Sequence, residues 1–137
     1  MAKIPYSLLP SETNKFVRLP LAKVLLNYKK THKITPVLVV ALIDSGADVC
    51  FCSGMIGAWL GIQFNKIKEK EFTAANRSTF KAKSEIITLH AYNKIYPCTF
   101  YFTDTLPKHI PIILGQIGFF DHFQICFNYN NCEITID

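Results

Sequence analysis

The chain has 137 residues, half of them hydrophobic, and a formal net charge of +5. This length and apolar content predict one domain with a substantial core and exclude a disordered chain. Its apolar runs stay far below the roughly 20 residues of a membrane-spanning helix, so no membrane insertion is expected. The lysines are scattered among loops and interleaved with acids, which argues against a nucleic-acid partner.

Five cysteines lack the spacing of a metal site: Cys50, Cys52, Cys98, Cys126 and Cys132. An odd number argues against a disulfide framework, and we expect mostly buried free thiols in a reducing compartment. The first residues lack the long apolar stretch of a secretory signal, so a cytoplasmic location is expected.

The first part of the chain is expected to be largely extended. Residues 1–15 are polar and punctuated by prolines, and we interpret them as an N-terminal arm ahead of a domain over 16–137. The apolar side chains of residues 16–28 favour an extended strand that bends near Pro20. Residues 29–36 indicate a hairpin loop.

A near-continuous apolar run over residues 35–43 is typical of a strand buried on both faces. Residues 49–52 predict another short strand. Ser53 is a suitable N-cap for a short helix over residues 54–60, and Trp59 is expected in the core beside that helix.

The second half of the chain alternates strands and polar turns. Residues 72–80 predict a hairpin with a polar tip, and residues 86–91 and 95–102 predict two further strands. After a loop, the expected elements are a buried strand over 110–114, a short helix over 117–123 and paired strands over 125–127 and 133–136. The pattern predicts an all-β fold, mostly strands with one or two short helices, in a compact barrel.

The most informative stretch is Asp44-Ser45-Gly46, which directly follows seven consecutive apolar residues. Burying a lone carboxylate at the end of such a strand is costly unless it is paired or protonated, so this position favours a functional acid. Ser45 can hydrogen-bond locally, and Gly46 permits a tight turn. The same three residues are also common turn chemistry, and taken alone they leave both interpretations open.

A second motif, Ile112-Ile113-Leu114-Gly115, lies late in the chain. Asp-Ser-Gly-Ala early and Ile-Leu-Gly late, in a chain of this size, resemble the retropepsin-like aspartic proteases. The resemblance extends from residue 16 to the C-terminus, and its motifs lie within residues 37–62 and 110–136. It implies a retropepsin-like acid protease barrel and aspartic endopeptidase activity on a peptide or protein substrate.

The resemblance implies a role for each residue of the early motif. Asp44 matches the catalytic aspartate, and Ser45 matches the hydroxyl residue that bonds across a dimer axis. Gly46 matches the glycine beside the substrate, and Ala47 matches the small residue after it. Asp48 matches an acid that binds substrate backbone in the retroviral enzymes, with an ordinary turn acid as the alternative.

Peptide hydrolysis by carboxylates needs two of them, one ionised and one protonated. The chain carries one Asp-Ser-Gly motif, and none of its other acids follows a buried strand in the same way. A homodimer supplies the second carboxylate, since a residue near a two-fold axis meets its own copy. We expect the Asp44 loop and one or both termini to form intersubunit contacts. No metal or organic cofactor is implied.

The resemblance also implies a flap, a hairpin that covers the substrate. Residues 72–80 occupy the corresponding place, and the substrate is expected to contact Ala75, Asn76 and Arg77 at the tip. Asn76 tolerates the left-handed backbone of a tight tip, and Arg77 would favour acidic side chains in a substrate. The alternative is a plain surface hairpin.

Ile112 and Leu114 are expected to line the cleft as substrate contacts. The sequence departs from the retroviral pattern at Gln116, where those enzymes often carry arginine. Arg18 is then a candidate partner for the Asp48 carboxylate. These departures leave a second hypothesis, in which the same fold serves as a catalytically weak or inactive dimeric module for peptide binding or scaffolding.

Overall fold

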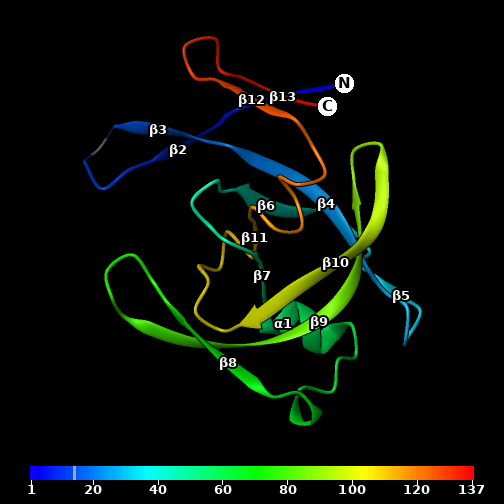
Figure 1. The fold of residues 1–137 in the computed structure, drawn as a ribbon. Coiled ribbons are helices and arrows are strands. Elements are labelled where there is room, and N and C mark those ends of the chain that lie inside the picture. The colour runs from blue at the N-terminus through cyan, green and yellow to red at the C-terminus, as the bar shows by residue number, and fades with distance from the viewer. Residues whose placement is uncertain (14) are drawn as a thin grey trace.

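A computed structural model describes residues 1–13 and 15–137. Its main body is a closed barrel (Figure 1), because β4 pairs with β9 as well as with β6 and so closes a ring of six strands. The ring runs in the order β4 (Leu21–Tyr28), β6 (Val39–Ile43), β11 (Ile112–Leu114), β7 (Cys50–Ser53), β10 (Lys94–Thr103) and β9 (Thr79–Ala91). The predicted all-β barrel is confirmed.

Shorter elements extend this ring. β5 (Lys33–Ile34) pairs with the end of β4, and β8 (Glu69–Thr73) pairs with the first part of β9 to form a long hairpin. The helix α1 (Gly54–Trp59) and the 3-10 turn η1 (Phe64–Lys66) lie between β7 and β8 in the chain. Within the described residues, no helix has the length and apolar character needed to cross a membrane.

The predicted short helix is present as α1. Ser53 caps it as expected, since its hydroxyl oxygen accepts a hydrogen bond from the Met55 amide at 3.3 Å. The expectation that Trp59 lies in the core is wrong, because Trp59 is 48% exposed and the Lys33 ammonium lies 5.5 Å from its ring centroid. A surface helix turns one face inward, and here the buried residue on that face is Gly57.

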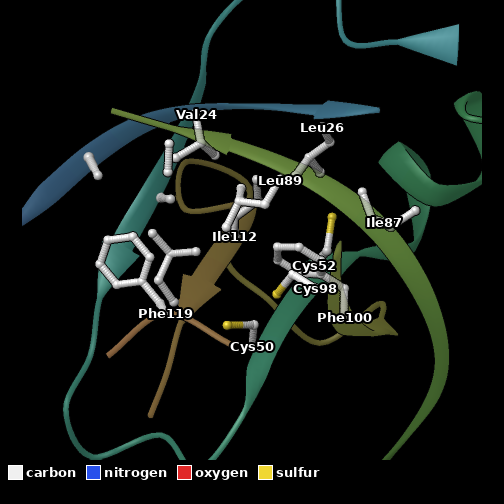
Figure 2. Packing of buried hydrophobic residues seen from close by; sticks show 14 of the residues in the cluster. Val24, Leu26, Cys50, Cys52, Ile87, Leu89, Cys98, Phe100, Ile112 and Phe119 are labelled. Carbon is white, nitrogen blue, oxygen red and sulfur yellow. The ribbon is translucent and has the colours of Figure 1, made fainter. Parts of the chain in front are cut away.

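The hydrophobic core fills the interior of the barrel (Figure 2). Strand alternation sends every second side chain of β4 and β9 inward, so Val24, Leu26 and Leu89 are fully buried, as are Ile112 and Phe119. Burying side chains of this size stabilises the fold by about 1.5–3 kcal/mol each. The core therefore fixes the register of the strands that lead to the site.

Three thiols belong to this core (Figure 2). Cys50, Cys52 and Cys98 are buried, Cys132 is partly buried and Cys126 is exposed, and all five are free. The expectation of mostly buried free thiols is confirmed. Burial raises the pKa of the Cys52 thiol, which therefore stays protonated and packs as a small apolar group.

The strand expected over residues 35–43 begins later than predicted, at Val39. Val37 and Leu38 are exposed rather than buried on both faces. Pro36 has no amide to donate to a neighbouring strand, and the backbone bends at residues 36–37. Apolar composition alone therefore overstated the length of this strand.

The helix expected over residues 117–123 is wrong, because this segment forms successive turns. Gly118 has a φ of +114°, outside the helical region, and its amide donates to the Asp121 Oδ1 atom at 2.9 Å. A side chain at Gly118 would meet the sulfurs of Cys98 and Cys50 at 2.9 and 3.0 Å. Close packing of this turn on the core outweighs its local helical preference.

The two ends of the chain pair with each other. β1 (Ala2–Pro5) runs antiparallel to β13 (Glu133–Ile136), and β12 (Ile125–Asn128) pairs with the other edge of β13. The paired strands predicted near the C-terminus are confirmed. Part of the segment interpreted as an N-terminal arm is thus a strand of this terminal sheet.

A separate two-stranded ribbon follows β1. It consists of β2 (Ser7–Pro10) and β3 (Phe16–Leu19), which pair antiparallel. β3 leads through Pro20 into β4, so the bend predicted at Pro20 divides residues 16–28 into two strands. Figure 1 shows the ribbon projecting from the barrel.

Candidate active site

Asp44 lies where two parallel strands of the barrel end together. β6 and β11 run parallel, with Ile43 beside Leu114. The Asp44 amide donates to the Leu114 carbonyl at 2.9 Å, and the Ile43 amide donates to the Pro20 carbonyl at 2.9 Å. Because Ile43 and Leu114 are buried in the core, the half-buried Asp44 is held at a fixed point of the barrel.

A tight turn follows this strand end, and we call residues 44–48 the Asp44 loop. The Ala47 amide donates to the Asp44 carbonyl at 3.2 Å, which closes the turn. The Gly46 amide donates to the Asp44 Oδ1 atom at 2.9 Å and so orients the carboxylate. The two interpretations of Asp44-Ser45-Gly46 are therefore compatible, because the same tight turn also holds the Asp44 carboxyl group in place.

The last residue of the late motif and the two residues after it pack against the backbone of the Asp44 loop. The amides of Gln116 and Ile117 donate to the carbonyls of Ala47 and Asp48 at 2.8 and 2.9 Å. A Cβ atom at Gly115 would lie 2.2 Å from the Val49 carbonyl oxygen and 2.6 Å from that of Ala47. The glycine is therefore required by the close approach of two backbones.

Gln116 adds a side-chain contact that the sequence did not reveal. Its Nε2 atom donates to the Ser45 carbonyl at 2.8 Å, at the tip of the Asp44 loop. The residue at which the sequence departs from the retroviral pattern is therefore an uncharged support of the same loop.

The proposed partnership between Arg18 and Asp48 is absent from the chain. Arg18 donates to the Tyr129 carbonyl and lies 5.0 Å from the centroid of the Tyr129 ring. Among the described residues, no cation lies within ion-pair distance of Asp48. The guanidinium instead joins the ribbon to the turn between β12 and β13.

A cleft of about 680 Å³ separates the Asp44 loop from the β8–β9 hairpin. Four loop residues that the sequence singled out line it, namely Asp44, Gly46, Ala47 and Asp48. The hairpin contributes Ala74, Ala75 and Ser78 from its tip. The structure thus brings the early motif and the hairpin over residues 72–80 to one cleft.

Several predicted substrate contacts do not line this cleft. Asn76 and Arg77 lie exposed at the outer end of the hairpin tip. Arg77, not Asn76, takes the left-handed backbone, with a φ of +67°. The Asn76 carboxamide oxygen accepts hydrogen bonds from the amide and the hydroxyl of Ser78. Ser45, which the resemblance assigns to a bond across a dimer axis and not to substrate, is exposed at the tip of the Asp44 loop and does not line the cleft.

The expectation that Ile112 and Leu114 line the cleft as substrate contacts is also wrong. Both are fully buried in the core, and Ile113 between them lines the cleft. Successive side chains of a strand point to opposite faces, so the two assignments were displaced by one residue. Ile112 and Leu114 support the cleft floor from beneath, and Ile113 forms part of its surface.

An aromatic cluster next to the tip of the hairpin is a further feature of the cleft. Phe72 and Phe80 face each other across the hairpin with centroids 5.6 Å apart. Both rings pack edge-on against Phe51 of β7, at 5.1 and 5.6 Å, and Tyr101 lies 5.1 Å from Phe72. These contacts fasten the hairpin to the barrel. The matched phenylalanines on either side of the polar tip were the available sequence signal.

The ionisable side chains of the cleft are acidic, although the whole chain has a formal net charge of +5. Asp44 and Asp48 are the ionisable side chains that line the described cleft, and its remaining lining is apolar, small or hydroxylated. The apolar wall includes Val49, Phe51 and Ile113. The cleft thus places two carboxyl groups beside an apolar surface.

The fold is similar to that of solved aspartic proteases. An EIAV protease complexed with the inhibitor HBY-793 matches with a TM-score of 0.55 and 18% identity, over 72% of this chain and 82% of that chain. A retropepsin-like aspartic protease from Rickettsia conorii matches with a TM-score of 0.63 and 13% identity, over 98% and 89%. No family model and no curated protein sequence matches the chain. The structural likeness shows a retropepsin-like fold.

Proposed function

We propose that the chain is an aspartic endopeptidase that works as a homodimer. One observation carries this proposal: the fold holds Asp44 at the end of two core strands, in a cleft whose other wall is the β8–β9 hairpin. A chain with a single such acid needs a second copy to assemble a pair of carboxyl groups. The two Asp44 loops would meet at the two-fold axis of the dimer.

The proposed reaction divides the work between two Asp44 side chains. Two carboxyl groups about 3 Å apart share one proton, because they cannot both ionise. The ionised carboxylate takes a proton from water as that water adds to the peptide carbonyl carbon, and the protonated one donates to the carbonyl oxygen. In the second step the proton taken from water passes to the amide nitrogen as the C–N bond breaks, and the other carboxylate takes back a hydroxyl proton as the new carboxyl group forms. The Gly46 amide, bonded to Asp44 Oδ1 in the single chain, keeps each carboxylate in its orientation.

The substrate in this proposal is an extended peptide. It would lie between the hairpin tip and the Asp44 loop and bind as an added strand through main-chain hydrogen bonds. Ala47 and Ala75 leave room for its backbone, and Asp48 is free to accept from its amides. Phe51 and Ile113 offer an apolar surface to its side chains.

The test compares the wild type with Asp44→Asn and with Asp104→Asn, an exposed acid outside the cleft. Each protein is incubated with a mixed peptide library at acidic to neutral pH, and the products are identified by mass spectrometry. We expect cleavage by the wild type and by Asp104→Asn, and none by Asp44→Asn. Sedimentation of the same samples should show a dimer.

Two results would contradict this proposal. Equal and negligible cleavage by a dimeric wild type and by Asp44→Asn would favour the hypothesis of an inactive peptide-binding module. A stable monomer that cleaves peptides would refute the argument that the second carboxylate comes from a second chain.

A further inference from the structure

One face of the ribbon of β2 and β3 carries exposed apolar side chains beside Arg18, and its own chain covers only the Arg18 end of that face. In its antiparallel register Leu8 lies opposite Arg18, and Pro10 lies opposite Phe16. Because side chains two residues apart share a face, these four lie on one side of the ribbon. Leu8 is 59% exposed and Phe16 is 70% exposed.

A ribbon of this kind is expected to need support. Two isolated strands are marginally stable in water, and they become stable when one face packs on another element. Among the described strands, β2 and β3 hydrogen-bond only to each other. Arg18, at the base of the ribbon, contacts Tyr129, while Leu8 and Phe16 stay in solvent.

The ribbon begins beside the candidate active site. Its second strand ends at Leu19, and the next residue, Pro20, accepts a hydrogen bond from the Ile43 amide at 2.9 Å. Ile43 directly precedes Asp44. Figure 1 shows the ribbon, the loop between β6 and β7 and the tip of the β8–β9 hairpin on the same side of the barrel. A molecule seated on the Asp44 loop would therefore meet the ribbon.

The terminal sheet, which the sequence predicts to join two subunits, has an open edge on each of its outer strands among the described strands, β1 and β12. β13 lies between β1 and β12, so both of its edges are already paired within the chain. The tip of the Asp44 loop is only a few residues, whereas a stable interface buries about 800 Å² on each partner. A dimer centred on Asp44 must take additional area from neighbouring surfaces.

We propose that the exposed face of the β2–β3 ribbon is a dimerisation arm that packs on a second copy of this chain. The proposal rests on the proposed homodimer, and it identifies Leu8, Pro10 and Phe16 as contact residues of that dimer. In a symmetric dimer each ribbon packs on the other subunit, so the same apolar face is buried on both copies of the chain. The large apolar side chains at the end of the ribbon anchor this contact.

The experiment measures dimer dissociation by sedimentation over a concentration series. The variants are Phe16→Glu and Leu8→Glu, and the matched control is Ile95→Glu. Ile95 is 68% exposed and lies on β10, whose hairpin with β9 lies on the opposite side of the barrel from the ribbon (Figure 1). Circular dichroism checks that each variant is folded.

We expect each ribbon variant to raise the dimer dissociation constant at least about tenfold, as charge at an apolar anchor does. Ile95→Glu should change the constant less than about twofold, since surface changes away from a contact have small effects. Amide hydrogen exchange of the wild type gives a test without substitution. Exchange in β2 and β3 should slow when the protein concentration rises from monomeric to dimeric conditions.

The outcomes separate this proposal from the proposed function. A wild-type dimer that Phe16→Glu and Leu8→Glu leave equally tight, with unchanged exchange in the ribbon, overturns the ribbon contact and leaves the peptidase proposal standing. An equal weakening by Ile95→Glu overturns the assignment to this face. A wild type that stays monomeric at every concentration overturns the homodimer itself, and the arm with it.

Discussion

Replacing Gly115 by alanine should displace the Asp44 loop. The added methyl carbon would lie 2.2 Å from the Val49 carbonyl oxygen and 2.6 Å from the Ala47 carbonyl oxygen. Ordinary contact begins near 3.4 Å, so the two backbones must separate by about an ångström. Both obstacles are main-chain atoms, and no side-chain rotation can relieve them.

The cost follows from the contacts that this separation would break. The amides of Gln116 and Ile117 donate to the Asp44 loop, as does the Gln116 side chain, and each such hydrogen bond stabilises by about 0.5–1.5 kcal/mol. Overpacking adds about 1–3 kcal/mol. We therefore expect Gly115→Ala to lower the free energy of unfolding by about 2.5–7.5 kcal/mol.

Urea denaturation at one fixed protein concentration measures this loss, since dimerisation would otherwise change the apparent stability. The midpoint should fall by more than about 1 M, given slopes of about 1–3 kcal/mol/M for small proteins. Gly46→Ala is the matched control. Its methyl carbon would lie 3.2 Å from the Asp44 Oδ1 atom, which a small side-chain shift relieves. Equal midpoints for Gly115→Ala and the wild type would refute the argument from backbone contact.

Three further changes test other parts of the structure. Gln116→Leu removes the donor to Ser45 and should reduce peptide cleavage roughly fivefold, about 1 kcal/mol, while Gln116→Asn shows whether a shorter amide restores the rate. Phe72→Ala removes the ring contacts of Phe72 and should lower the free energy of local opening of the hairpin by about 1–3 kcal/mol. Amide exchange in the hairpin tip should then become faster, and unchanged exchange would contradict the anchoring role of Phe72. Burial raises the pKa of Glu85, but hydrogen bonds from Tyr28, the Ile86 amide and Lys30 outweigh it and lower the pKa. Glu85→Gln should therefore destabilise the fold at pH 7 by about 1 kcal/mol, with the difference lost in urea midpoints as the pH falls below about 4, and a constant difference would refute this.

The site was predictable where its chemistry is local. Asp44, Gly46 and Ala47 lie within four consecutive residues. A strand that ends in an acid followed closely by a glycine predicts a tight turn, and the structure contains that turn. The hairpin was recognisable for a similar reason, because Phe72 and Phe80 flank a polar tip. Local patterns thus located both sides of the cleft.

The failures concern contacts between distant segments. Periodicity placed Ile112 and Leu114 on one face, but only the packed barrel decides that this face is the core. The turn at Gly118 depends on two cysteine sulfurs contributed by β7 and β10. The pairing of β1 with β13 joins the two ends of the chain. Short-range patterns do not encode such contacts, because each depends on side chains from another part of the sequence.

The uncharged contact between Gln116 and Ser45 fits the chemistry proposed for Asp44. An arginine paired with a carboxylate loses its partner when the acid is protonated, so such a support weakens in acid. A carboxamide bonded to a carbonyl does not titrate, and the contact at 2.8 Å should persist at any pH at which the barrel is folded. Two Asp44 side chains that share a proton need one carboxyl group protonated, a state that acid favours. Gln116 therefore supports the loop under the conditions in which the proposed pair would work.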